Sequence, residues 1–174
     1  LYLYHSMSEF SDQAIWLSST ASDVPTLQAA HYFRIKIKLK SAIFKATLRY
    51  SALGVLEPWI NGERVHEDYF TPGWSDYRKR AYVCEYDVSD NLQKGENCLG
   101  VVLGDGWAGA PFGPAGYAVS FAPRTMFIAE LVVQYANGEE EIISSGADWK
   151  WRKGSITRNS IYNGETFDAR KSVL

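Results

Sequence analysis

The chain has 174 residues, of which 46% are hydrophobic and 22% are charged, and its formal net charge is −2. This balance is typical of one globular domain; it excludes a disordered or collagen-like chain and argues against a nucleic-acid-binding protein, which carries a basic excess. Aromatic residues make up 14% of the chain, which fits both a β-rich core and a sugar-binding surface.

The first regular pattern is a strict alternation over residues 33–40. The odd positions are apolar and the even positions are Arg or Lys, which predicts a half-buried antiparallel strand with a solvated basic face. Basic side chains on such a face could bind phosphate, but lysines there also prevent edge-to-edge pairing of strands. The pattern alone therefore identifies a strand and no ligand.

Three further alternating stripes, over residues 82–88, 99–103 and 127–135, predict more strands. Asn61-Gly62 and Asn137-Gly138 each lie between apolar runs and predict hairpins with type I′ turns. Pro58 marks a strand edge or start, and residues 95–97 are expected to form a turn. No apolar run approaches the roughly 20 residues that cross a bilayer.

Helical signals are weak throughout the chain. The best one is residues 87–92, where Asp87 or Ser89 could cap a single short turn. Short strands separated by turns predict a β-sandwich or barrel. Residues 104–123 are rich in Gly and Pro, and a long irregular segment of this kind inside a domain is usually a functional loop.

The two cysteines, Cys84 and Cys98, lie in different predicted strands. We expect two free thiols, or a disulfide if the two strands are neighbours. A zinc site would need four ligands at closer paired spacings.

Six short motifs occur in a fixed order: 61–65 (NGERV), 72–77 (PGWSDY), 86–89 (YDVS), 95–97 (GEN), 103–107 (LGDGW) and 161–170 (IYNGETFDAR). In this order they resemble the N-terminal domain of bacterial α-L-rhamnosidases, multidomain glycoside hydrolases. The usual family form has Tyr where Phe167 stands. The resemblance covers about residues 29–170; it leaves 1–28 as an extension or the remnant of a preceding domain, and 171–174 as the start of a linker.

The resemblance implies an all-β jelly-roll sandwich of the galactose-binding-domain-like type, without catalytic activity, ahead of a helical-barrel catalytic domain. Glycoside hydrolysis needs two carboxylates that flank the bond, and no pair of acidic residues here is singled out by spacing. The expected partners are rhamnose-containing carbohydrate and the neighbouring domains, with no nucleic acid and no membrane. The expected location of the parent protein, from the resemblance alone, is periplasmic or extracellular.

Five residues are candidates for carbohydrate binding: Trp107, Asp105, Trp74, Asp76 and Asn61. Each tryptophan follows a glycine and could stack on a sugar ring, with a nearby carboxylate setting hydroxyl specificity. The competing interpretation is structural: the indoles close one end of the sandwich, Asp76 caps a turn, and Asn61 is a hairpin residue.

No catalytic residue, metal ligand or cofactor is expected. Some rhamnose-binding domains that resemble this one hold calcium with an Asp-Asn pair before the hairpin glycine. Here that position is Ile60-Asn61, so one oxygen ligand is missing. A calcium ion could instead bind near Asp87, Asp90 and Asn91 or near Asp105, but no motif supports this. The three histidines are scattered, without zinc or triad spacing.

Two functions follow from these expectations. One is an accessory domain that aids recognition of the glycan, in which Trp74 or Trp107 is exposed beside a concave polar pocket. The other is a purely structural module that packs against the catalytic domain, in which both indoles are buried and an apolar patch marks the docking surface.

Overall fold

The computed structural model describes residues 10–19, 29–109, 121–122 and 124–171. Its strands, in chain order, are β1 (His31–Leu39), β2 (Ile43–Leu53), β3 (Val55–Ile60), β4 (Glu63–Arg64), β5 (Val83–Asp87), β6 (Gly95–Gly104), β7 (Met126–Tyr135), β8 (Glu140–Ser144), β9 (Lys150–Lys153), β10 (Ile156–Ser160) and β11 (Gly164–Phe167). One short helix, α1 (Gly106–Gly109), follows β6.

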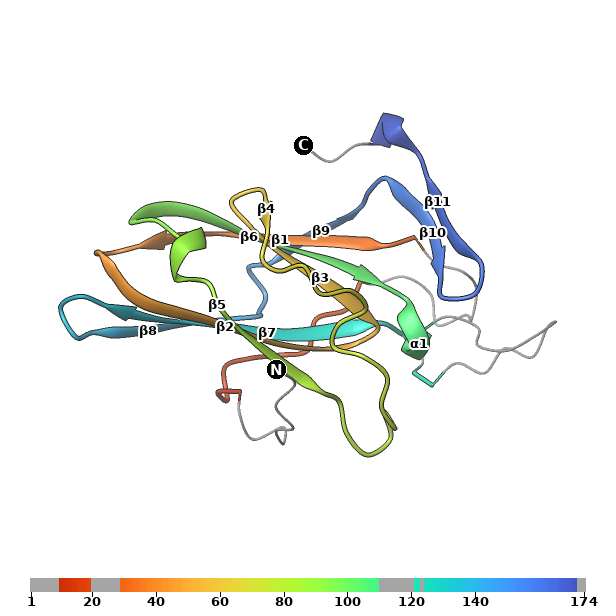
Figure 1. Cartoon of the computed structure of the whole chain (residues 1–174), viewed down its shortest axis with the longest axis horizontal. Helices are drawn as coiled ribbons and strands as arrows, with labels where there is room; N and C mark the ends of the chain where they lie inside the picture. The colour runs from red at the N-terminus through yellow and green to blue at the C-terminus, as the bar shows by residue number, and fades with distance from the viewer. Residues whose placement is uncertain (1–9, 20–28, 110–120, 123, 172–174) are drawn as a thin grey trace.

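The strands form two antiparallel sheets that stack face to face (Figure 1). The five-stranded sheet has the order β4-β3-β6-β1-β9, and the four-stranded sheet has the order β5-β2-β7-β8. Strands β10 and β11 pair as a separate hairpin. The predicted all-β jelly-roll sandwich is confirmed. Within the described residues, no helix has the length and apolar character to span a membrane.

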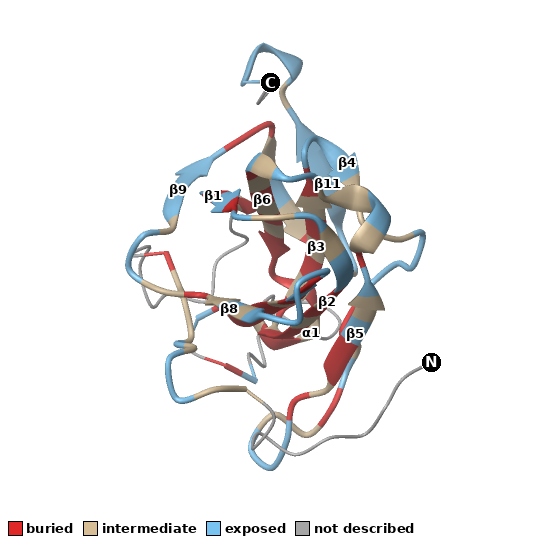
Figure 2. Ribbon diagram, turned by 90° about the vertical axis from the view of Figure 1, so that its left-hand side faces the viewer, coloured by how far each residue is buried: buried red, intermediate tan, exposed pale blue. Residues whose placement is uncertain are grey.

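The core lies between the two sheets, where Figure 2 shows the buried residues. The predicted alternation is confirmed in β1, β6 and β7: the inward positions are buried or half-buried, and the basic positions of β1 are exposed. Phe33 of β1 and Phe127 of β7 meet across the sandwich, edge to face, with ring centroids 4.9 Å apart. Aromatic pairs in this geometry stabilise a core beyond the area that they bury.

The first hairpin is formed as predicted. Asn61 (φ 52°) and Gly62 (φ 86°) both have positive φ angles, as a type I′ turn requires, and they connect β3 to β4. Pro58 lies opposite Val101 of β6, and its carbonyl oxygen accepts a hydrogen bond from the N–H of Val65 on the other side. The missing N–H of Pro58 therefore faces away from β6, so the sheet loses no ladder bond there.

The second hairpin differs from the prediction. Only Gly138 has a positive φ angle (87°), and its N–H donates to the carbonyl oxygen of Tyr135. The N–H of Tyr135 in turn donates to the carbonyl oxygen of Glu139. This is a type I turn followed by a glycine in the left-handed region, a longer loop in which Asn137 keeps a negative φ angle. The type I′ prediction for Asn137-Gly138 is wrong.

Two other local expectations need correction. Residues 95–97 form the start of β6 and not a turn. The change in chain direction before β6 occurs at Gly95, which has a φ angle of 95°. The short turn after β5 is a 3₁₀ turn at Ser89–Asn91. Asp87 accepts hydrogen bonds from the backbone N–H and the hydroxyl of Ser89, so it supports the turn from outside.

The cysteines are free thiols. Cys84 lies in β5 and Cys98 in β6, which belong to different sheets. The strands are not neighbours, so the disulfide alternative is not realised. Burial raises the pKa of the Cys84 thiol to about 11, because a thiolate is unfavourable in apolar surroundings.

Residues 10–19 run over the outer face of the four-stranded sheet. Leu17 forms an isolated bridge with Phe127, and the N–H of Ile15 donates to the carbonyl oxygen of Ser145. The N–H of Ser11 donates to Oε1 of the buried Glu130 at 2.9 Å, and its hydroxyl donates to the same oxygen. Part of the predicted extension is thus attached to the sandwich; the boundary at residue 28 stays a prediction. Residues 172–174 of the predicted linker lie outside the described residues.

Candidate functional site

Five aromatic residues, from the β4–β5 connection and from the segment that follows β6, lie near one end of the sandwich. We call Phe70, Trp74, Tyr77, Trp107 and Phe121 the aromatic cluster. Phe70 meets Trp107 edge to face at 5.9 Å between ring centroids. Phe121 lies 6.1 Å from Trp74 and 6.4 Å from Tyr77, again between centroids. The cluster joins the β3–β5 connection to the segment that follows β6.

Backbone hydrogen bonds hold the parts of the cluster together. The N–H of Phe121 donates to the carbonyl oxygen of Ala108 at 3.1 Å, which ties Phe121 to α1. The N–H of Leu56 in β3 donates to the carbonyl oxygen of Thr71 at 2.8 Å, which ties the segment of Phe70 to the sheet. The aromatic positions are therefore set by the two sheet strands β3 and β6.

Glycines supply both turns that carry a tryptophan. Gly73 precedes Trp74 with a φ angle of 96°, and Gly106 precedes Trp107 with a φ angle of 51°. Side-chain-bearing residues rarely adopt these angles. A Cβ atom at Gly106 would also lie 2.7 Å from Cγ1 of Val55, so α1 approaches β3 closely only because this position has no side chain.

The two tryptophans differ in their exposure. Trp74 is 51% exposed, whereas Trp107 is half-buried against Phe70. Tyr77 is embedded below them: its hydroxyl donates to the carbonyl oxygen of Gly73 at 3.2 Å, and burial raises its pKa to about 12. Trp74 therefore does not close the end of the sandwich but presents an indole to solvent, together with Phe70, which is 60% exposed.

The two candidate carboxylates have structural surroundings. Asp105 is only 1% exposed, so its side chain does not reach the surface beside Trp107. Asp76 pairs with Arg78 (3.2 Å) and Lys79 (3.7 Å), and its Oδ1 accepts the N–H of Arg78. The hydrogen bond to Arg78 lowers the pKa of Asp76. Asp76 organises its own turn, in agreement with the structural interpretation.

Asn61 lies at the other end of the sandwich. Ile60 pairs with Leu99, whereas Val55 pairs with Gly104 at the α1 end, so Asn61 and Asp105 are about 20 Å apart along the sheet. The amide nitrogen of Asn61 donates to the carbonyl oxygen of Asn91 and to Oδ1 of Asn97, both at 2.9 Å. Its Oδ1 accepts the N–H of Cys98. Asn61 is thus occupied in fixing the hairpin.

The sequence-based candidates therefore separate into two groups. Trp107 contacts Phe70 and Trp74 contacts Phe121 at the same end of the sandwich, Asp76 and Asp105 lie in the adjoining turns, and Asn61 is remote. Sequence reasoning missed Phe70 and Phe121 as cluster members. Both lie outside alternating stripes, and only their exposure in the fold marks them.

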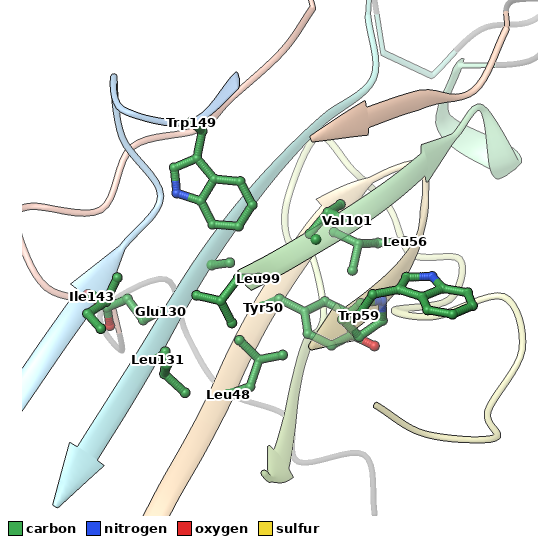
Figure 3. Close-up of a pocket in the computed structure, with 13 residues that line it drawn as sticks. Leu48, Tyr50, Leu56, Trp59, Leu99, Val101, Glu130, Leu131, Ile143 and Trp149 are labelled. Carbon is green, nitrogen blue, oxygen red and sulfur yellow. The ribbon is translucent and has the colours of Figure 1, made fainter. Parts of the chain in front are cut away.

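An interior cavity between the sheets does not provide a ligand site (Figure 3). Its volume of about 10 Å³ gives room for one water molecule at most. Leu48 and Leu131 of one sheet face Leu56, Leu99 and Val101 of the other across it. A sugar ring cannot enter this space.

The described residues include no group of three or more His, Cys, Asp or Glu side chains placed to hold a metal ion. Asp87 accepts hydrogen bonds from Ser89, and Asn91 uses its carbonyl oxygen to hold Asn61. Two of the calcium candidates, Asp87 and Asn91, therefore use these oxygens in local structure.

A hydrogen-bond chain centred on His66 fixes the β3–β5 connection. The N–H of Asp68 donates to Nδ1 of His66 (3.2 Å), and Nε2 of His66 lies 2.8 Å from the Tyr50 hydroxyl. Tyr50 donates to Thr71, which donates to the carbonyl oxygen of Leu56.

Because Tyr50 uses its proton for Thr71, the network assigns the proton of His66 to Nε2. His66 also stacks on Tyr86 at 4.0 Å between centroids.

This network predicts acid sensitivity of the fold. Desolvation lowers the pKa of His66 below its ordinary value of 6.5, and burial together with Lys153 lowers that of His31. The folded protein therefore binds fewer protons than the unfolded chain, and stability is highest above pH 6.5 and decreases as the pH falls below it. Urea denaturation at pH 7.5, 6.5 and 5.5 will show a falling free energy of unfolding.

The same measurement on His31→Asn/His66→Asn tests the assignment. The double variant will be less stable at pH 7.5 but will lose less stability between pH 7.5 and 5.5. An unchanged slope would show that other groups cause the pH dependence.

The comparisons with known proteins agree with this architecture. A family model described as "Alpha-L-rhamnosidase N-terminal domain" matches residues 41–174. The chain belongs to this family. It is 40% identical over 153 residues to an alpha-L-rhamnosidase of Streptomyces avermitilis, covering 86% of this chain and 14% of that protein. It is 36% identical over 147 residues to one of Formosa agariphila, covering 82% and 15%.

Solved structures show the same relationship. Native alpha-L-rhamnosidase of Aspergillus terreus is 31% identical with a TM-score of 0.87, over 92% of this chain and 19% of that one. The Streptomyces avermitilis enzyme complexed with L-rhamnose is 37% identical with a TM-score of 0.81, over 85% and 14%. A Pleurotus ostreatus lectin in complex with GalNAc, covering 91% of this chain and 39% of its own, has a TM-score of 0.53 at 17% identity, which is a likeness of fold alone. The rhamnosidase N-terminal domain thus spans about a seventh of its curated relatives' length.

Proposed function

We propose that this chain is a non-catalytic accessory domain of an α-L-rhamnosidase, and that the aromatic cluster contacts rhamnose-containing glycans. The observation that carries the proposal is the exposure of Trp74 and Phe70. Exposed aromatic groups on a soluble domain indicate an interaction site. The family membership makes a glycan the relevant ligand.

The chemistry of the cluster suits a sugar. An indole face packs against the apolar C–H face of a pyranose, and burial of both surfaces favours the contact. The carboxylates near the cluster are buried or paired. We therefore expect weak binding of L-rhamnose, with a dissociation constant above about 0.1 mM.

A non-catalytic role is supported by the surroundings of the acidic residues. Asp87, Asp76 and Asp168 each accept hydrogen bonds from groups within two residues of themselves. These carboxylates stabilise turns rather than facing another acid across a groove, which glycoside hydrolysis requires. We expect this chain alone to release no nitrophenol from nitrophenyl α-L-rhamnoside.

Trp74→Ala tests the glycan contact directly. Titration with L-rhamnose, followed by NMR chemical-shift changes, will show at least tenfold weaker binding to Trp74→Ala than to the wild type, while the melting temperature stays within a few degrees. The matched control is Phe44→Ala, because Phe44 is exposed on β2 and lies outside the cluster. Equal binding by all three proteins would overturn the carbohydrate role.

A structural role is the second candidate, and the β10–β11 hairpin favours it. Phe167 is 60% exposed and Tyr162 is 58% exposed on this hairpin, which stands apart from the two stacked sheets (Figure 1). Exposed aromatic groups there would suit packing against another domain of the parent enzyme. Retention of L-rhamnose binding in Phe167→Ala and its loss in Trp74→Ala would separate the two roles.

A further inference from the structure

The outer face of the five-stranded sheet carries an aromatic residue and several cations in one row. Trp59 of β3 pairs with Gly100 of β6, Gly100 pairs with Arg34 of β1, and Arg34 pairs with Lys150 of β9. Because cross-strand partners point to the same face, Trp59, Arg34 and Lys150 project from one surface. Three strand spacings make this row about 14 Å long.

The cations of this face are exposed to solvent. The basic residues Arg34 and Lys36 of β1 and Lys150 and Arg152 of β9 are all exposed. Within the part of the chain that the structure describes, none of them forms an ion pair. The net charge of the whole chain is −2, so this face is a local positive region on a protein that is not basic overall.

Trp59 is held in place beside these cations. Its Nε1–H donates to Oε1 of Glu57 at 2.9 Å, and Oε2 of Glu57 pairs with Nε of Arg64 at 3.0 Å. The carboxylate of Glu57 is therefore neutralised by Arg64. A restrained indole loses little rotational freedom when a ligand binds, which favours its use as a platform.

Gly100 places no side chain between Trp59 and Arg34. A Cβ atom there would lie 3.5 Å from Cβ of Trp59, an ordinary contact, so packing does not demand glycine at this position. The absence of a side chain allows a ligand to approach the sheet backbone between the indole and the guanidinium.

We propose that this face binds glycan chains whose units carry carboxylate groups, that is, uronic-acid-containing glycans. A sugar ring would stack on Trp59, and carboxylates would pair with Arg34 and Lys150; a guanidinium binds a carboxylate with two parallel hydrogen bonds. The inference rests on the proposed role as a glycan-contacting domain and adds a second surface, outside the aromatic cluster, with a defined ligand chemistry. Charge complementarity and the adjacent aromatic platform together favour an acidic glycan over a simple anion.

The test is calorimetric titration of the 174-residue protein with oligogalacturonate, and with the same oligomer fully methyl-esterified. The acid form will bind, its affinity will fall as salt is raised, and the neutral ester will bind at least tenfold more weakly. Arg34→Gln/Lys150→Gln will weaken binding of the acid form at least tenfold. The control Lys94→Gln/Arg158→Gln removes the same charges from exposed positions outside this face and will leave binding unchanged.

A second variant tests the surface without changing its charge. Gly100→Val fills the space between Trp59 and Arg34 with a residue that suits a strand, and it will weaken binding while circular dichroism stays unchanged. Equal affinity for acid and ester, or no effect of Arg34→Gln/Lys150→Gln, would overturn the proposal. Equally tight binding of phosphatidylserine vesicles or single-stranded DNA would also overturn it, because the face would then bind anions without selecting a glycan.

The outcome is separable from that of the carbohydrate role of the aromatic cluster. Trp74→Ala will leave oligogalacturonate binding intact, since Trp74 lies outside this sheet face. Failure of L-rhamnose binding with retained oligogalacturonate binding would reject the aromatic cluster alone.

Discussion

Phe127→Ala will lower the free energy of unfolding by about 3–5 kcal/mol, the usual cost of removing a buried phenylalanine ring. Phe127 is 0% exposed near the start of β7. Its ring meets Phe33 of the opposite sheet and Trp149, with centroid distances of 4.9 Å and 5.5 Å. Loss of the ring would leave a void between sheets whose side chains are fixed by strand register and cannot close around it.

Phe44→Ala is the matched control for this prediction. Phe44 lies on β2, in the same sheet, but is 75% exposed, so its truncation will cost less than about 1 kcal/mol. Urea denaturation followed by tryptophan fluorescence measures both. Similar losses in the two variants would show that the sandwich is not held together through Phe127.

Gly106→Ala will destabilise the protein by about 3 kcal/mol, through backbone strain and overpacking together. Gly106 has a φ angle of 51°, and an added Cβ would meet Cγ1 of Val55 at 2.7 Å and two backbone atoms of Gly54 and Val55 at 2.9 Å. Backbone atoms of a paired strand cannot move aside easily. The start of α1 would have to shift, and Trp107 and the aromatic cluster would shift with it.

Gly138→Ala separates the two contributions. Gly138 has a φ angle of 87°, but nothing lies within 4 Å of an added Cβ. Its substitution will therefore show the backbone strain alone, about 1–2 kcal/mol. Thermal denaturation of both variants gives the comparison. If the two variants lose the same stability, close packing of α1 against β3 is not the reason for glycine at position 106.

The strands were predictable because successive side chains of a half-buried strand point alternately to the core and to solvent, which leaves an alternating pattern in the sequence. The stripes in β1, β6 and β7 follow from a side-chain period of two. The Asn61-Gly62 turn was predictable for the same local reason. The identical dipeptide at Asn137-Gly138 folds differently, because the loop between β7 and β8 includes Ala136 and Glu139 and needs only one positive φ angle. The length of the loop therefore decides the turn type, and the Asn-Gly dipeptide alone does not.

The candidate site was predictable only in part. Gly73-Trp74 and Gly106-Trp107 stood out because a glycine before a large aromatic residue indicates a tight turn. Their placement at the same end of the sandwich could not be foreseen, since it depends on hydrogen bonds between segments distant in sequence, such as that of Leu56 with Thr71. The burial of Asp105 could not be predicted from the sequence either. An acidic residue beside a loop tryptophan suggests a ligand contact, but α1 packs closely against β3 and Asp105 is buried.

The path of residues 10–19 makes the two outer faces of the sandwich different. On one side the chain covers its own sheet, with Leu17 bridged to Phe127 and Ser11 bonded to Glu130. On the opposite side Arg34 and Lys150 are exposed and Trp59 is half-buried. The two outer faces of the sandwich therefore differ. Residues 10–19, which precede the first strand, cover one of them and leave the other available to a long glycan chain.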